Sequence, residues 1–213
     1  MKCFAIVPAA GRSQRMGTAK LLLPWGDSTI LESVLAAWLA SAVSRVVVVV
    51  HPADQEIADR SAAAGAEVVR PSDPPGEMKE SVRIALAYLK DSAPRSTDAW
   101  LVAPADMPGL NPRAIDAVIR TYEASLPSGG EPAIWVPRHE GRAGHPVLFP
   151  WRMAEEVARL APAESLKSLF ARHAVHYLDT AEPVAEDVDT LADYERLRPS
   201  TVAAAEPTRK RQK

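Results

Sequence analysis

Short apolar segments alternate along the chain with segments in which apolar residues recur every three or four positions. The unbroken β-branched run at residues 45–50 is typical of a strand that is buried on both faces of a parallel sheet. Helical spacing instead places Ile30, Val34 and Trp38 on one face of a helix. The pattern predicts strands at 4–8, 45–50, 67–69, 100–103, 133–136, 146–149 and 175–178, and helices at 30–42, 54–64, 78–90, 112–125, 152–160, 165–172 and 191–197.

This alternation indicates an α/β protein with an open, mostly parallel central sheet that helices cover on both faces. Ligands of such sheets bind at the carboxyl ends of the strands, so functional residues are expected just after the apolar runs. We expect one domain over residues 1–198. The tail at 199–213 has few large apolar residues and a basic end, and we expect it to be disordered.

Composition excludes several classes of protein. The 213 residues carry a formal net charge of −2, which argues against a protein that binds mainly to the phosphate backbone of nucleic acid. No apolar run reaches the length of a membrane span, so we expect no membrane association. Cys3 is the single cysteine, which excludes an internal disulfide and is compatible with the cytoplasm.

The segment after the first predicted strand, AAGRSQRMGTAK at residues 9–20, has the chemistry of an anion site. Its small residues let backbone N–H groups approach an anion closely, and Ser13 adds a hydroxyl donor. Arg12, Arg15 and Lys20 supply three positive charges within nine residues, as a polyphosphate requires. The spacing fits neither a Walker A loop nor G-x-G-x-x-G, so a P-loop kinase and a dinucleotide oxidoreductase lose support. The alternative is an ordinary strand–helix turn with solvated charges.

Asp106 follows the predicted strand at 100–103, where the ligand crevice of such a sheet lies. Mg²⁺ prefers one or two carboxylates together with phosphate oxygens and water. A strand-end aspartate can instead cap the next turn, and the position alone does not separate the two roles.

Residues 8–24 resemble the nucleotide-binding signature of the MobA-like NTP transferases, in the pattern PAAGRS-x-RMG-x-x-K-x-LLP. The resemblance, which extends over roughly residues 3–198, implies a Rossmann-like, GT-A-type three-layer sandwich and Mg²⁺-dependent nucleotidyl transfer. It further implies catalytic roles for Arg15, Lys20 and Asp106. By similarity the loop residues that contact the nucleotide are Ala9, Ala10, Gly11, Arg12 and Ser13, with Arg15 and Lys20 also on the phosphates.

The same resemblance assigns roles to later segments. Asp106, in an Asp-x-Pro element, and Asp189, in DTLADY, would hold the Mg²⁺ ion, while Asp187 is the weaker candidate. Thr190 is expected to cap the helix at 191–197 whether or not Asp189 binds metal. Gly76 and Ser81 would lie beside the base and ribose.

The segment RAGHPVLF at residues 142–149 resembles the family's Gly-x-Pro-x-x-Phe element, which lines the acceptor site. Arg142 and His145 would then hold an anionic acceptor. Lys79 begins a helix, where the helix dipole disfavours a cation, so we expect it to point to solvent and to matter less for NTP use than Lys20.

The loop at Ala9–Gly11 resembles the cytidylyl branch, since guanylyl members tend to have a second glycine there. The implied reaction is transfer of CMP, favoured over GMP, from CTP or GTP to a phosphorylated small molecule, molybdopterin first, with release of pyrophosphate. A molybdoenzyme or its chaperone is a further candidate partner. The alternatives are a sugar-phosphate nucleotidyltransferase and a non-catalytic nucleotide-binding module, and the presence of both Asp106 and Asp189 argues against the module.

Overall fold

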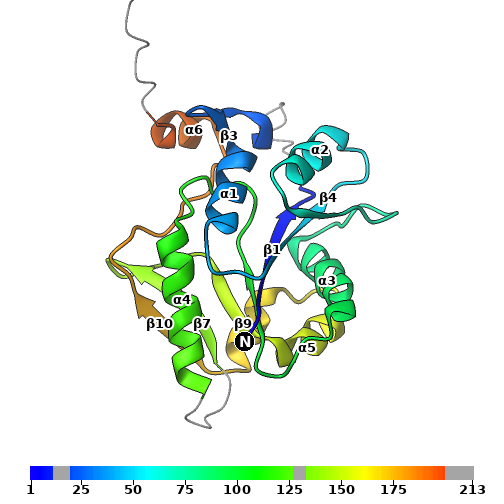
Figure 1. Ribbon diagram of the computed structural model, residues 1–213, viewed down its shortest axis with the longest axis vertical. Coiled ribbons are helices and arrows are strands. Elements are labelled where there is room, and N and C mark those ends of the chain that lie inside the picture. Colours follow the sequence, from blue (N-terminus) through cyan, green and yellow to red (C-terminus); the bar gives the residue numbers. More distant parts are fainter. Residues whose placement is uncertain (12–19, 127–132, 200–213) are drawn as a thin grey trace, which may run out of the picture.

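The strands of this computed structural model join side by side in the order β10-β7-β9-β6-β1-β4-β5. The structure describes residues 1–11, 20–126 and 133–199 (Figure 1). β9 runs antiparallel to β6 and β7, while the other neighbours on this path are parallel. The strands are β1 (Cys3–Ala9), β4 (Arg45–Val50), β5 (Glu67–Val69), β6 (Ala99–Val102), β7 (Ile134–His139), β8 (Arg142–Ala143, paired with β7), β9 (Val147–Pro150) and β10 (Val175–Asp179).

Helices cover both faces of this sheet, so the predicted α/β sandwich is confirmed. One face packs against α1 (Ile30–Leu39), α2 (Gln55–Ala63) and α4 (Pro112–Ser125). The other packs against α3 (Met78–Leu89) and α5 (Ala154–Arg159), and Figure 1 shows α4 and α3 on opposite sides of β1. No helix within the described ranges is long and apolar enough to cross a membrane.

Alternation of side chains along β1 explains why the core has two halves. Cys3, Ala5 and Val7 face the cluster beneath α1 and α4, whereas Phe4 and Ile6 face the cluster beneath α3. A fully buried strand with both faces apolar is the arrangement expected of a central strand in a covered sheet. Cys3 is only 2% exposed, and burial, followed by the charge of Asp98, raises the pKa of its thiol to about 12.

Several short elements differ from the sequence-based expectation. A hairpin of β2 (Pro24–Trp25) and β3 (Ser28–Thr29) precedes α1, and β8 was not expected. Two residues per strand are too few to produce a visible alternation. The predicted helix at 165–172 is a 3₁₀ helix, Leu166–Ala171, and further 3₁₀ turns cover Lys20–Leu22, Lys90–Ser92 and Trp151–Met153. Helix α6 (Leu191–Leu197) packs on the β2–β3 hairpin through Tyr194, which contacts Pro24 and Trp25 of β2 (Figure 1).

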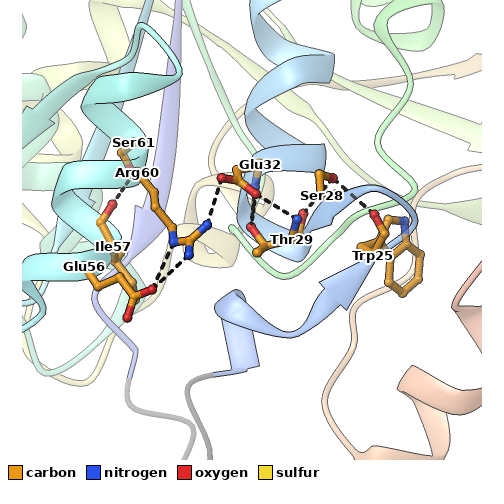
Figure 2. A network of polar contacts seen from close by, with 8 residues as sticks. All are labelled: Trp25, Ser28, Thr29, Glu32, Glu56, Ile57, Arg60 and Ser61. Atoms are coloured by element: carbon orange, nitrogen blue, oxygen red, sulfur yellow. Dashed lines mark hydrogen bonds and ion pairs between the residues drawn. The ribbon is translucent and has the colours of Figure 1, made fainter.

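A polar network fixes the start of α1 against α2 (Figure 2). The Thr29 hydroxyl accepts from the backbone N–H of Glu32 at 3.3 Å, and Glu32 Oε2 accepts from the Thr29 N–H at 2.9 Å, which completes a capping box. Arg60 on α2 forms ion pairs with Glu32 and Glu56 at 3.1 and 3.0 Å. The hydrogen bonds from Thr29 lower the pKa of Glu32. The stabilising effect of the Glu32 carboxylate is therefore present at neutral pH and is lost as the pH falls through that lowered pKa.

Thr29→Ala is expected to destabilise the protein by about 1 kcal/mol, because it removes the acceptor of the capping box. Urea unfolding at pH 7 measures the change. Ser33→Ala, on the first turn of the same helix, is the control, since it removes a single bond to the carbonyl of Pro108 and no cap. A smaller effect for Thr29→Ala than for Ser33→Ala would contradict the role of the cap.

Candidate active site

Asp106 lies beside the end of β1, at the carboxyl edge of the sheet. β1 and β6 are parallel, with Ile6 opposite Val102. Beyond β6 the chain continues along β1, where the Ala105 N–H donates to the Pro8 carbonyl at 3.2 Å. This register places Asp106 next to the segment Ala9–Gly11, at the edge where parallel α/β sheets bind ligands.

Lys20 contacts both carboxylates that the sequence selected as metal ligands. Its Nζ lies 2.7 Å from Asp106 Oδ2 and 3.2 Å from Asp189 Oδ1. The Lys20 side chain is 10% exposed, that of Asp106 21% and that of Asp189 51%. Burial alone would lower the pKa of Lys20, but the hydrogen bonds and charges of Asp106 and Asp189 outweigh it and raise the pKa. The ammonium therefore stays charged between two carboxylates from distant parts of the chain.

Asp189 reaches the site on an irregular segment, residues 180–190, which we call the strap. Val188 is fully buried, and its N–H donates to the Asp106 carbonyl at 2.9 Å. The strap also packs on a glycine: a Cβ added to Gly144 would lie 2.5 Å from Val184 Cβ. The strap thus places Asp187 and Asp189 on either side of an anchored valine.

α6 continues the strap and ties it to the segment that carries Lys20. Thr190 caps α6 by accepting from the Asp193 N–H at 3.1 Å, and Asp193 Oδ2 accepts from the Thr190 N–H at 3.0 Å. The Tyr194 hydroxyl donates to the Pro24 carbonyl at 2.7 Å. The predicted division of roles, in which Thr190 caps the helix and leaves Asp189 free for other contacts, is confirmed for the cap.

Negative charge exceeds positive charge in the described part of the site. Desolvation, together with the charges of Asp189 and Asp106, raises the pKa of Asp187. Among residues 1–11, 20–126 and 133–199, Lys20 thus contacts two carboxylates, and a third, Asp187, lies near both of them. Such an arrangement favours binding of a further cation.

The donor set fits a divalent ion. Asp106 Oδ1 is buried and has no hydrogen-bond partner within the described segments, so it is an oxygen available for a ligand. Asp189 is half exposed and can turn towards it. No three His, Cys, Asp or Glu side chains among the described residues already stand in metal-binding geometry. Binding of an ion by Asp106 and Asp189 would therefore require side-chain movement, starting with Lys20.

His145 lies near the carboxylates. Its Nδ1–H donates to the Val102 carbonyl at 3.1 Å, which leaves Nε2 as the acceptor of the neutral ring. Burial lowers the pKa of His145, although the charges of Asp106 and Asp187 act in the opposite direction. A neutral imidazole suits hydrogen bonding to a substrate better than the electrostatic capture of an anion. Arg142 stands exposed on β8.

The predicted nucleotide-binding residues divide into three groups. Ala9 and Ala10 are buried, and the Ala9 methyl group belongs to the core, so these residues can offer their backbone to a ligand. Gly76 and Ser81 flank the start of α3, where the Gly76 N–H donates to Glu80 Oε2 at 2.5 Å. Ser81 is buried. Gly11 is exposed, with open space where a Cβ would stand. The other predicted contacts, Arg12, Ser13 and Arg15, lie outside the described residues.

Lys79 does not point to solvent, contrary to the expectation from its helix position. It is 4% exposed, and its ammonium donates to the carbonyls of Ala161, Pro162 and Glu164, the first at 3.2 Å. A cation on the first turn of a helix is disfavoured by the dipole alone, but three carbonyl dipoles from another segment outweigh that effect. Lys79 is a structural residue that ties α3 to the turn after α5.

Lys79→Met is expected to destabilise the protein by about 2–3 kcal/mol, because methionine fills the volume but leaves three carbonyls without their donor. Urea unfolding measures the change. Lys90→Met is the control: Lys90 follows the same helix and is exposed, so its replacement should be nearly neutral. Equal midpoints for the two variants would show that the carbonyl contacts of Lys79 add nothing to stability.

Sequence reasoning missed the residues that hold the strap in place. Val188 and Val184 stand in a polar segment without periodicity, so neither signals a core position. Tyr194 falls within the predicted helix at 191–197, but its bond to Pro24 depends on tertiary structure. Gly144 stands in the segment that the sequence predicts to line the acceptor site. The structure shows that the missing side chain at this position allows Val184 of the strap to pack closely.

Comparison with known proteins places this geometry in a family. The chain is 28% identical over 192 residues to the Molybdenum cofactor cytidylyltransferase of Escherichia coli K12, covering 89% of this chain and 92% of that protein. It is 26% identical over 199 residues to the Nicotine blue oxidoreductase of Paenarthrobacter nicotinovorans, covering 90% and 94%. The solved structure of Rv0371c from Mycobacterium tuberculosis H37Rv in complex with manganese is 30% identical, with a TM-score of 0.68 and coverage of 93% and 98%.

A family model, the MobA-like NTP transferase domain, matches residues 5–177. That range includes Lys20 and Asp106 but ends before the strap, so the place of Asp189 in the site rests on its contact with Lys20. The family match and the observed fold agree with each other. The chain belongs to the MobA-like NTP transferase family, the metal-dependent nucleotidyltransferases that use an NTP and a phosphorylated acceptor.

Proposed function

We propose that this enzyme transfers CMP, in preference to GMP, from an NTP to a phosphorylated small molecule, with molybdopterin as the first candidate, and releases pyrophosphate. The observation that carries the proposal is the convergence of Asp106, Asp189 and Lys20 at the carboxyl edge of β1 and β6. The relative named Molybdenum cofactor cytidylyltransferase supports the choice of CTP and acceptor.

The proposed chemistry is an in-line displacement at the α-phosphorus. An oxygen of the acceptor phosphate forms the new P–O bond while the bond between the α-phosphorus and the pyrophosphate oxygen breaks. The acceptor is already ionised near neutral pH, so the site needs no strong general base. Catalysis then consists mostly of positioning and of neutralising charge.

Each site residue that the structure describes has a part in this scheme. Asp106 and Asp189 would hold Mg²⁺, which supplies positive charge to the polyphosphate oxygens when it is bound. Lys20 would offset charge on the departing pyrophosphate. Backbone N–H groups of the segment Ala9–Gly11 would contact the phosphates, since the side chains there are small or buried.

His145 would act on the acceptor side as a neutral hydrogen-bonding group. Gly76 and Ser81 would contact base and ribose from the start of α3. Arg12, Ser13 and Arg15 would complete the phosphate contacts, and Arg142 would approach the acceptor from β8.

The decisive experiment is a panel of CTP, GTP, ATP and UTP with Mg²⁺, each with molybdopterin, in which pyrophosphate release is followed. We expect release with CTP above GTP, and only when acceptor is present. Methylerythritol phosphate and a hexose 1-phosphate test the alternative of a sugar-phosphate acceptor. Absence of release above the blank with every combination would contradict nucleotidyl transfer and favour the non-catalytic binding module.

A redox arm belongs in the same panel, because one relative is named Nicotine blue oxidoreductase. NADH or NADPH is offered with a quinonoid dye, and loss of nicotinamide absorbance is followed. We expect no oxidation beyond the rate without enzyme. Turnover in this arm without pyrophosphate release in the other would replace the proposed transfer by hydride chemistry.

A further inference from the structure

A cation already lies between the two carboxylates proposed to bind one. Lys20 Nζ contacts one oxygen of each, at 2.7 and 3.2 Å, and the lysine side chain is almost completely buried. Both contacts are short enough for charge-assisted hydrogen bonds. The second oxygen of Asp106, Oδ1, is buried without a partner within the described residues.

A divalent ion cannot bind the two carboxylate oxygens that Lys20 contacts while the ammonium stays in place. Oxygen ligands stand at about 2.0–2.1 Å from Mg²⁺, so an ion on those two oxygens would occupy the space of the ammonium. An ion bound by Asp106 Oδ1 alone would remain within a few ångströms of the lysine charge. Repulsion between like charges at that distance is strong next to a lysine side chain that is only 10% exposed.

A polyphosphate would offer Lys20 alternative partners. Within the described ranges, its two hydrogen-bond acceptors are the same two carboxylates. The ammonium stands next to the carboxyl end of β1, where the nucleotide phosphates are proposed to bind. A polyphosphate there offers several anionic oxygens to which the flexible lysine side chain can turn.

We propose that Lys20 competes with the divalent cation for Asp106 and Asp189, and that NTP relieves this competition by drawing the ammonium onto its phosphates. The site therefore binds the cation weakly by itself and binds cation and nucleotide cooperatively. The second half of this inference rests on the proposed function, whereas the competition rests only on the contacts of Lys20. By linkage, the factor by which NTP strengthens cation binding is the factor by which the cation strengthens NTP binding.

The test measures binding of Mn²⁺ alone to the full chain, without nucleotide, by electron paramagnetic resonance or calorimetry. Lys20→Gln removes the competing charge, and we expect its Kd for Mn²⁺ to be at least about tenfold lower than that of the wild type. Lys20→Arg keeps the charge and should bind Mn²⁺ as weakly as the wild type. Lys167→Gln is the matched control, because Lys167 is exposed and affects the site only through its long-range charge. Its Kd should change less than twofold.

Thermal unfolding gives a second readout that tolerates an unstable variant. A ligand stabilises the folded state in proportion to the logarithm of its concentration over Kd. The melting temperature of Lys20→Gln should thus rise with Mn²⁺ at concentrations that leave the wild type unchanged. Equal Mn²⁺ affinity in wild type and Lys20→Gln overturns the competition, and so does an equal gain in Lys167→Gln.

The two proposals fail in different ways. If no nucleotide and acceptor give pyrophosphate but Lys20→Gln binds Mn²⁺ tightly, the competition stands and the transfer reaction falls. If CTP turns over normally while the Mn²⁺ affinity of Lys20→Gln is unchanged, the transfer reaction stands and the competition falls.

Discussion

Asp106→Asn is expected to lower kcat/KM for nucleotidyl transfer at least about a thousandfold, which corresponds to about 4 kcal/mol of transition-state stabilisation. The amide keeps the size of the side chain but removes the charge that Lys20 contacts at 2.7 Å and that a divalent ion requires. The fold should persist, because Asp106 is not part of either apolar cluster. Pyrophosphate release with saturating Mg²⁺ measures the loss.

Asp59→Asn is the control for this variant, since Asp59 is an exposed aspartate on α2 with a single contact to Gln55. Its kcat/KM should stay within about twofold of the wild type. Melting curves of both variants separate a catalytic loss from unfolding. Retention of more than a tenth of the activity by Asp106→Asn would show that Asp106 does not bind the metal.

Gly144→Ala is expected to lower both stability, by about 2 kcal/mol, and kcat/KM, by about a hundredfold. The new methyl group would stand 2.5 Å from Val184 Cβ, a distance that real Cβ atoms do not adopt, so the strap must move. Asp189 stands only five positions after Val184 along the strap, so a movement at Val184 carries Asp189 away from Lys20. Urea unfolding and steady-state kinetics measure the two effects.

Gly109→Ala and a double variant show whether the clash is the cause. A Cβ at Gly109 would meet Ala185 Cα at 4.0 Å, an ordinary contact, so this variant should behave nearly as the wild type. Val184→Gly removes the atom that Gly144→Ala approaches, and the double variant should recover much of the lost activity. Damage that adds up in the double variant would mean that Gly144 acts on the acceptor and not through the strap.

The long elements follow from sequence because their signals are local. The residues of α4 and β4 match the predicted ranges, since a proline at the first helical position and an unbroken β-branched run each specify one structure. The direction of β9 was not predictable in this way. An apolar segment such as residues 147–150 contains no information on whether its neighbours run parallel to it, because direction depends on how the intervening chain returns.

The site residues also differ in whether their roles follow from local sequence or from tertiary contacts. Asp106 was identifiable because it directly follows a buried strand, and Asp189 because it stands in a motif. The burial of Lys79 was not, because the carbonyls it contacts come from residues more than eighty positions away. The position of Lys20 between the two carboxylates was not predictable either. Asp106 and Asp189 lie far from Lys20 in the sequence, so only the fold brings the three side chains together.

The buried thiol of Cys3 in β1 also makes it possible to measure how often the folded protein opens. Cys3 is the only cysteine, it stands in the strand between β4 and β6, and its pKa is about 12. An alkylating reagent at pH 8 therefore reacts mainly with molecules in which the start of β1 has opened and exposed Cys3, because only then is the thiolate formed in quantity. At reagent concentrations where alkylation is faster than reclosing, the rate of labelling equals the rate of opening. Two variants with the same melting temperature can thus be told apart by how often each exposes Cys3.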